Sequence, residues 1–132
     1  TNQKQVQKFL DLGLSFDIIV DDSLHNYSGF IPNLINFFPL LKKNGYFFLE
    51  DFSTADKRLK AQREYNEKCG KKLQGYSFTM EEIFNFLNKK TYFESRYFDK
   101  KNQKYFHENL KKFELFYLDF PESSLALLEK ND

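Results

Sequence analysis

The sequence has 132 residues, which is enough for one domain with one hydrophobic core. Twenty Lys and Arg residues oppose nineteen Asp and Glu residues, and the net charge of +1 gives no overall attraction to nucleic acid or anionic lipid. No apolar run reaches the roughly 18 residues of a membrane span, and no signal peptide is evident. The single cysteine, Cys69, excludes an internal disulfide and favours a reducing, cytoplasmic compartment.

The first two elements are predicted to be a short helix and a buried strand. Apolar residues recur at helical spacing between residues 4 and 12, and Gly13 follows where a helix end favours glycine. The apolar run 16–20 is typical of a strand covered on both faces. This strand ends at two adjacent carboxylates, Asp21 and Asp22.

The next apolar segment predicts a helix that leads into a second buried strand. Ser28 is a suitable N-cap, and residues 30–41 are mostly apolar. Gly45 is expected to end the helix and release the chain into a strand at 46–49, which again ends at two carboxylates. The order of strand, helix and strand predicts a parallel βαβ unit, and hence an α/β fold.

The carboxyl ends of two parallel strands lie at the same edge of a sheet, where ligands bind in open α/β folds. Asp21, Asp22, Glu50 and Asp51 should therefore lie close together, and such carboxylates repel one another unless a cation joins them. A divalent cation with oxygen ligands is the natural candidate. His25 lies in the loop after Asp22 and can point at the same place.

The middle of the chain, residues 56–72, is dense in Lys, Arg and Glu. Because charge runs usually face water, a solvated helix or loop is the favoured interpretation. The alternative is an active-site lid, since the segment follows the second acidic pair. In that case three cations could attract an anionic substrate: Lys57, Arg58 and Lys60.

Thr79 and Glu82 form a capping-box pattern that predicts a helix over residues 80–89. Residues 91–110 are ambiguous, because aromatic residues alternate there with Lys and Asn. Such a segment can bind single-stranded nucleic acid by stacking, but the near-neutral charge of the chain argues against it. The apolar runs 113–120 and 124–129, separated by a short loop, predict a hairpin.

The motif D-D-x-x-H after a strand, followed by F-P-L-L-K-x-x-G-Y-x-x-x-E-D, extends over residues 16–51. It resembles the metal-dependent class I S-adenosylmethionine (SAM) O-methyltransferases, and among them the macrocin/mycinamicin sugar O-methyltransferases and their cephalosporin-hydroxylase-like relatives. Two departures occur. Ser23 and Leu24 stand where Gly and Ser are usual, and Lys43-Asn44-Gly45 replaces Pro-Gly-Gly.

The resemblance implies a partial Rossmann-like methyltransferase sheet, in which a parallel βαβ unit is followed by a C-terminal antiparallel hairpin. In that family the final strand inserts antiparallel beside the strand that here is 46–49. Residues 1–132 would then be the C-terminal portion of a single methyltransferase domain. Because the sequence starts at Thr1 without a leader, we expect it to be part of a longer chain.

The resemblance also implies roles for the site residues. Asp22, Glu50 and Asp51 match the family's Mg²⁺ ligands, and His25 matches its general base. We assign Asp21 to cofactor binding rather than to the metal, and expect it to support the loop beside the site. The acceptor would be a hydroxyl of a sugar or a glycosylated small molecule, with no nucleic acid or membrane partner and with a homo-oligomer possible.

The glycine-rich loop with which this family binds SAM has no match here, because none of the five glycines has the spacing G-x-G. We expect that loop upstream of Thr1, so this polypeptide alone should bind SAM poorly and be inactive.

Two other classes of protein share part of this pattern. A phosphoacceptor receiver domain also ends a strand in Asp-Asp, but its later strand should end in Lys rather than in Glu50-Asp51. A non-catalytic remnant or interaction domain would keep only the fold. Independently of function, a sheet edge left exposed by strands expected upstream would favour association or aggregation of this chain.

Overall fold

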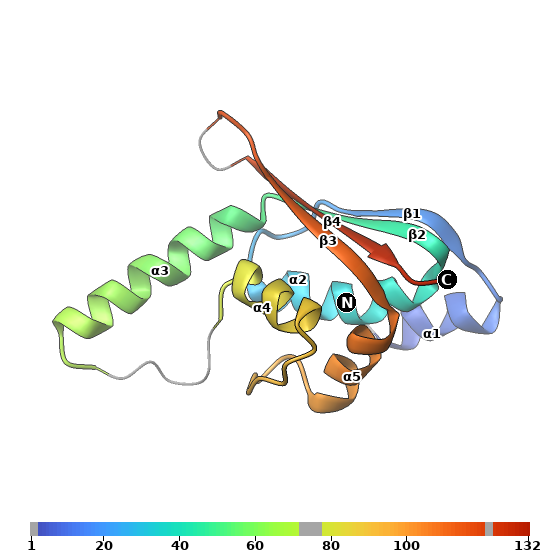
Figure 1. The fold of residues 1–132 in the computed structure, drawn as a ribbon, viewed down its shortest axis with the longest axis horizontal. Coiled ribbons are helices and arrows are strands. Elements are labelled where there is room, and N and C mark those ends of the chain that lie inside the picture. Colours follow the sequence, from blue (N-terminus) through green and yellow to red (C-terminus); the bar gives the residue numbers. More distant parts are fainter. Residues whose placement is uncertain (1–2, 72–77, 121–122) are drawn as a thin grey trace.

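The computed structural model describes residues 3–71, 78–120 and 123–132, which build a four-stranded sheet with helices packed on one face (Figure 1). The first half contains α1 (Gln3–Asp11), β1 (Phe16–Asp21), α2 (Tyr27–Phe37), the 3₁₀ turn η1 (Phe38–Leu40) and β2 (Leu41–Glu50). The second half contains α3 (Phe52–Lys68), α4 (Met80–Asn88), α5 (Lys100–Asn109), β3 (Leu110–Tyr117) and β4 (Ser124–Lys130).

The sheet has the strand order β1-β2-β4-β3. β1 and β2 are parallel, with Asp21 opposite Leu49. β4 is antiparallel to both of its neighbours, β2 and β3. The predicted βαβ unit and C-terminal hairpin are therefore confirmed, and so is the antiparallel insertion of the last strand beside the second.

The core lies between the sheet and the helices on its one covered face. Phe30 of α2, Phe84 of α4 and Phe106 of α5 are fully buried against side chains such as Phe47 and Leu49 of β2. The C-terminal half of β2 thus contributes every second residue to the core, as the pleat of a sheet requires.

The other face of β1 is not covered within the described residues. Ile18 and Val20 are 58% and 55% exposed, whereas Ile19 between them packs against the core. The prediction that this strand is covered on both faces is therefore wrong for this part of the chain. The apolar run fits a two-sided strand, but α2, α4 and α5 all lie on the same side of the sheet (Figure 1).

The α2 and β2 boundaries differ from those predicted. Asn26, not Ser28, caps α2, because its side chain accepts a hydrogen bond of 2.9 Å from the Gly29 N–H. β2 begins at Leu41, so Gly45 lies inside the strand rather than before it. A Cβ at Gly45 would lie 2.9 Å from the Lys42 carbonyl oxygen of the same strand and 3.0 Å from the Asp17 carbonyl oxygen of β1, so both contacts favour glycine there.

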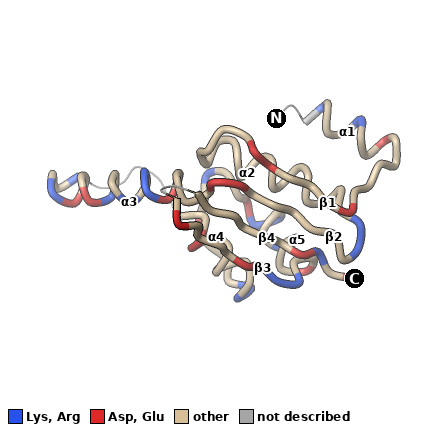
Figure 2. The backbone as a smooth tube through the Cα atoms, turned by 90° about the horizontal axis from the view of Figure 1, so that it is seen from above, with Lys and Arg blue, Asp and Glu red and all other residues tan. Residues whose placement is uncertain are grey.

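The charged segment forms α3, whose distal part extends away from the sheet with Lys, Arg and Glu along its surface (Figure 2). The first turn of α3 is buried, and most of the later residues are exposed. This agrees with the expectation of a solvated helix as far as residue 71, and the end of that segment lies outside the described residues. The predicted capping box of α4 is confirmed, with Thr79 Oγ1 accepting from Glu82 N–H and Glu82 Oε2 accepting from Thr79 N–H.

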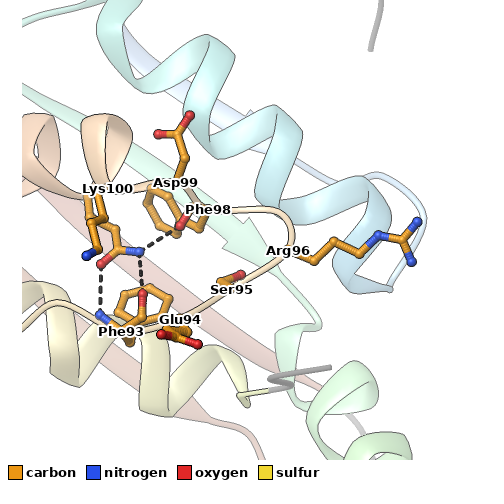
Figure 3. Close-up of a pocket in the computed structure, with 8 residues that line it drawn as sticks. Phe93, Glu94, Ser95, Arg96, Phe98, Asp99 and Lys100 are labelled. Carbon is orange, nitrogen blue, oxygen red and sulfur yellow. Dashed lines mark hydrogen bonds between the residues drawn. The ribbon is translucent and has the colours of Figure 1, made fainter. Parts of the chain in front are cut away.

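Residues 91–99, part of the ambiguous segment, form a loop that is pinned by one buried side chain (Figure 3). Gln103 of α5 accepts a hydrogen bond from the Phe93 N–H and donates to the Phe93 and Phe98 carbonyl oxygens. The loop borders a shallow hollow of about 390 Å³ that is distant in sequence from the acidic pairs. Among the helices of the described residues, none is long and apolar enough to cross a membrane.

Candidate functional site

The candidate site lies at the edge of the sheet where β1 and β2 end. The parallel register carries Asp21 to the level of Leu49, so the residues that follow both strands emerge side by side. Asp22 follows β1, and Asp51 follows β2 and precedes α3. The loop between β1 and α2 then brings His25 back over the same edge.

Three of the predicted site residues converge. The Nε2 atom of His25 lies 3.4 Å from Asp22 Oδ1 and 3.8 Å from Asp51 Oδ2. The imidazole ring stacks at 6.2 Å on the buried ring of Phe30, which limits its orientation. The side chains of His25 and Asp51 are each 34% exposed, so water and a ligand can reach them.

Asp51 is held in place by the C-terminal hairpin. Its backbone has a φ of 51°, in the left-handed region that non-glycine residues rarely adopt. The Asp51 N–H donates to the Ser124 carbonyl oxygen at 2.7 Å, and the Ser124 N–H donates to Asp51 Oδ1 at 3.3 Å. One carboxylate oxygen is thus engaged by β4, and the other faces His25. A strained backbone that its surroundings fix in this way is common at functional sites.

Asp21 lies beneath the loop and not on its surface. The residue is 6% exposed, and its Oδ1 atom accepts from the Ser23 N–H at 3.1 Å and from Asn33 Nδ2 at 3.2 Å. These bonds tie the loop to α2, which is the supporting position expected of Asp21. Its Oδ2 atom is buried and has no hydrogen-bond partner among the described residues.

Glu50 is separated from the other three residues. It is the last residue of β2, opposite Leu125, and the alternation of side chains places it on the same face as Phe48. No hydrogen bond or ion pair joins it to Asp22, His25 or Asp51 in the part of the chain that the structure describes. Within those same residues, no three His, Cys, Asp or Glu side chains are close enough to hold a metal ion together.

A buried network behind the site was not found from the sequence. Asp56 of α3 accepts from Tyr27 Oη at 2.7 Å, from the Met80 N–H at 2.7 Å and from the Glu81 N–H at 3.3 Å. Burial raises the pKa of the Asp56 carboxyl, and burial together with the Asp56 charge raises the pKa of the Tyr27 phenol. The network fixes the start of α3 to α2 and α4, and no local sequence signal pairs Tyr27 with Asp56.

Two hollows lie on opposite flanks of α3. The hollow on the His25 side has a volume of about 200 Å³ and is lined by His25, Asn26, Tyr27, Ala55, Arg58 and Leu59. The second, of about 340 Å³, is lined mainly by α3 and the β3–β4 hairpin, with Lys57, Lys60 and Tyr117 among its residues. The three cations that the sequence grouped together therefore face two different surfaces.

No protein-family model and no curated protein matches the sequence. The fold is similar to that of the MycE methyltransferase from the mycinamycin biosynthetic pathway. One MycE structure, in complex with Mg and SAH, matches with a TM-score of 0.61 at 18% identity. Another, with Mg, SAH and mycinamycin VI, matches with a TM-score of 0.56 at 16% identity. Each match covers 98% of this chain and 29% of the MycE chain. The chain thus has a partial Rossmann-like methyltransferase fold.

Proposed function

We propose that this chain supplies the metal- and acceptor-binding part of a SAM-dependent O-methyltransferase that acts on a hydroxyl of a sugar or glycosylated small molecule. The observation that carries the proposal is the convergence of Asp22 and Asp51, from two strand ends, on Nε2 of His25. The MycE structures support the class of reaction, since they hold Mg and SAH, and one also holds mycinamycin VI.

Among the described residues, two carboxylates at this edge offer the donor type that a divalent cation takes, and the other coordination positions would be left to water or the acceptor. Asp22 and Asp51 offer carboxylate oxygens, the donors that Mg²⁺ prefers. The buried Oδ2 atom of Asp21 has no partner among the described residues, which indicates a site whose charges are not fully compensated. We propose that Asp22 and Asp51 hold the cation, with Glu50 as a further ligand on the strength of the motif. A cation bound there would make an acceptor hydroxyl easier to deprotonate.

The chain's own residues perform the proton transfer in this proposal. Nε2 of His25 accepts the proton of the acceptor hydroxyl while the oxygen is methylated. Phe30 packs against the imidazole on one side, and the bonds between Asp51 and Ser124 hold the carboxylate beside it. Asp21 holds the loop that carries His25 through its bonds to Ser23 and Asn33.

The SAM-binding element lies outside these residues in our proposal, because the chain contains no glycine-rich loop. The 132-residue chain by itself should therefore bind SAM weakly and show no methyl transfer. Isothermal titration of SAM into the chain tests this point. Micromolar affinity would show that the chain binds the cofactor without a glycine-rich loop.

The proposed metal site can be located by ¹H–¹⁵N NMR with substoichiometric Mn²⁺. The paramagnetic ion should broaden the amide signals of residues 22–25 and 50–52 first, while signals from the loop at residues 93–98 persist. Broadening centred elsewhere, or spread evenly over the acidic surface, would refute a metal site at this edge.

The alternative function is a non-catalytic interaction domain that keeps only the fold. It is favoured by the exposed apolar side chains of Ile18 and Val20 on the uncovered face of the sheet. This alternative predicts no localised Mn²⁺ broadening, whereas the methyltransferase proposal requires it.

A further inference from the structure

The hollow beside His25 contains one cationic side chain, Arg58. The guanidinium-bearing side chain is exposed on α3 and lines the same space of about 200 Å³ as the imidazole of His25. Ala55 and Leu59 of the same helix are both buried, and together they form an apolar wall of this hollow. A charge against an apolar wall attracts an opposite charge more strongly than one surrounded by water.

Arg58 has no hydrogen bond or ion pair with any described residue. Arg63, five positions later on the same helix, donates to both carboxylate oxygens of Glu82 at 3.2 and 2.8 Å. Two carboxylates that precede Arg58 in the chain are already engaged. Asp56 accepts bonds from Tyr27 and the start of α4, and Asp51 is held by Ser124 and faces His25. Arg63 therefore stabilises the fold, whereas Arg58 remains available to a ligand.

We propose that Arg58 binds an oxyanion group, a carboxylate or a phosphate, carried by the acceptor. A guanidinium recognises such groups through paired N–H donors. The hollow is smaller than the roughly 300–1,000 Å³ of typical ligand pockets, so it suits a single sugar ring rather than a whole glycoside. Arg58 and His25 line the same hollow, so a ring whose oxyanion binds Arg58 can present a hydroxyl to His25. The acceptor class is then an acidic or phosphorylated sugar, and its identity as a methyl acceptor rests on the proposed function.

The test is an NMR titration of the chain with three probes in the presence of EDTA: glucuronate, glucose 6-phosphate and glucose. We expect at least one charged probe to shift signals of residues 25–27 and 55–59, and neutral glucose to bind at least tenfold more weakly. Arg58→Gln should weaken binding of the charged probe about tenfold, the loss expected for one charge-assisted contact. Arg58→Lys keeps the charge without the paired donors, so its affinity for the charged probe should lie between those of the wild type and Arg58→Gln. Lys57→Gln removes a neighbouring exposed cation on the other flank of α3 and should change affinity less than twofold.

Equal binding of glucose and the charged probes would overturn the inference, and so would equal losses in Arg58→Gln and Lys57→Gln. Retained signal dispersion in the Arg58→Gln spectrum would show that the variant is folded. Because no metal is present, the result does not depend on the Mn²⁺ experiment. Arg58-dependent binding of glucuronate without any metal site would leave this inference standing and the methyltransferase proposal refuted.

Discussion

The network around Asp56 should be a major contributor to stability, because one buried carboxylate holds three donors. Asp56→Ala leaves the Tyr27 hydroxyl and the Met80 and Glu81 N–H groups without their acceptor. Asp56 is 5% exposed, so water cannot readily replace it in the folded state. At about 1 to 3 kcal/mol for an unsatisfied buried donor, and with the weaker 3.3 Å bond discounted, the loss should be roughly 3 kcal/mol.

Urea denaturation followed by circular dichroism measures this loss. Tyr27→Phe removes only one donor and should cost about 1 to 2 kcal/mol. Combined with Asp56→Ala, its effect should be smaller than it is alone, because the two side chains share one bond. Glu64→Ala, an exposed carboxylate on the same helix, is the control and should change stability by less than about 0.5 kcal/mol. A loss for Asp56→Ala no larger than the control's would refute the reasoning.

Three further predictions concern other parts of the fold. Gln103→Leu should lower the free energy of unfolding by roughly 2 to 4 kcal/mol, because it leaves three backbone groups of the 93–98 loop unpaired. Urea denaturation measures this loss, and a loss below about 1 kcal/mol would contradict the role given to Gln103. Burial and the charge of Lys90 lower the pKa of His107 below 6.5, so the unfolded chain takes up a proton first and stability should fall as pH drops through 6.5. The fall should be smaller in His107→Leu than in the wild type, and equal slopes would refute it. Ile18→Lys with Val20→Lys should reduce self-association in sedimentation velocity, since both side chains are exposed on the uncovered face; unchanged association would place the contact elsewhere.

The sequence predicted those features that depend on local chemistry. The capping box of Thr79 and Glu82 needs only a four-residue pattern, and the structure contains it. The glycine at position 13 has a φ of 64° and ends α1, as its place after an amphipathic segment indicates. The hairpin and the parallel unit follow from strand length and order, and both are present.

Features that depend on distant contacts were not predictable. Asn26 and Ser28 are both good caps, and only the fold of the preceding loop selects Asn26. The apolar run of β1 indicates a strand covered on both faces, but it does not say whether the second layer belongs to this part of the chain, and here Ile18 and Val20 are exposed. The pairing of Tyr27 with Asp56 joins two helices, and the sequence around each residue is compatible with an exposed position.

The candidate site was predictable in part for the same reason. The register of parallel strands brings the ends of β1 and β2 together, so Asp22, His25 and Asp51 meet as expected. The alternation of side chains then determines which of Glu50 and Asp51 faces His25. The contact that holds the Asp51 side chain comes from Ser124 of β4, a strand far along the chain. The contacts do not test the roles themselves: Asp22, Glu50 and Asp51 as metal ligands, His25 as the general base and Asp21 in cofactor binding all stay predictions.

The central claim is that Asp22 and Asp51 form one cation site with His25, and Mn²⁺ affinity by isothermal titration tests it directly. Wild-type chain should bind one Mn²⁺, and Asp22→Asn and Asp51→Asn should each weaken binding at least tenfold. Asp17→Asn, at the opposite end of β1 and paired with Lys42, should leave the affinity unchanged. No binding by the wild type, or the same affinity in Asp22→Asn as in Asp17→Asn, would contradict the account.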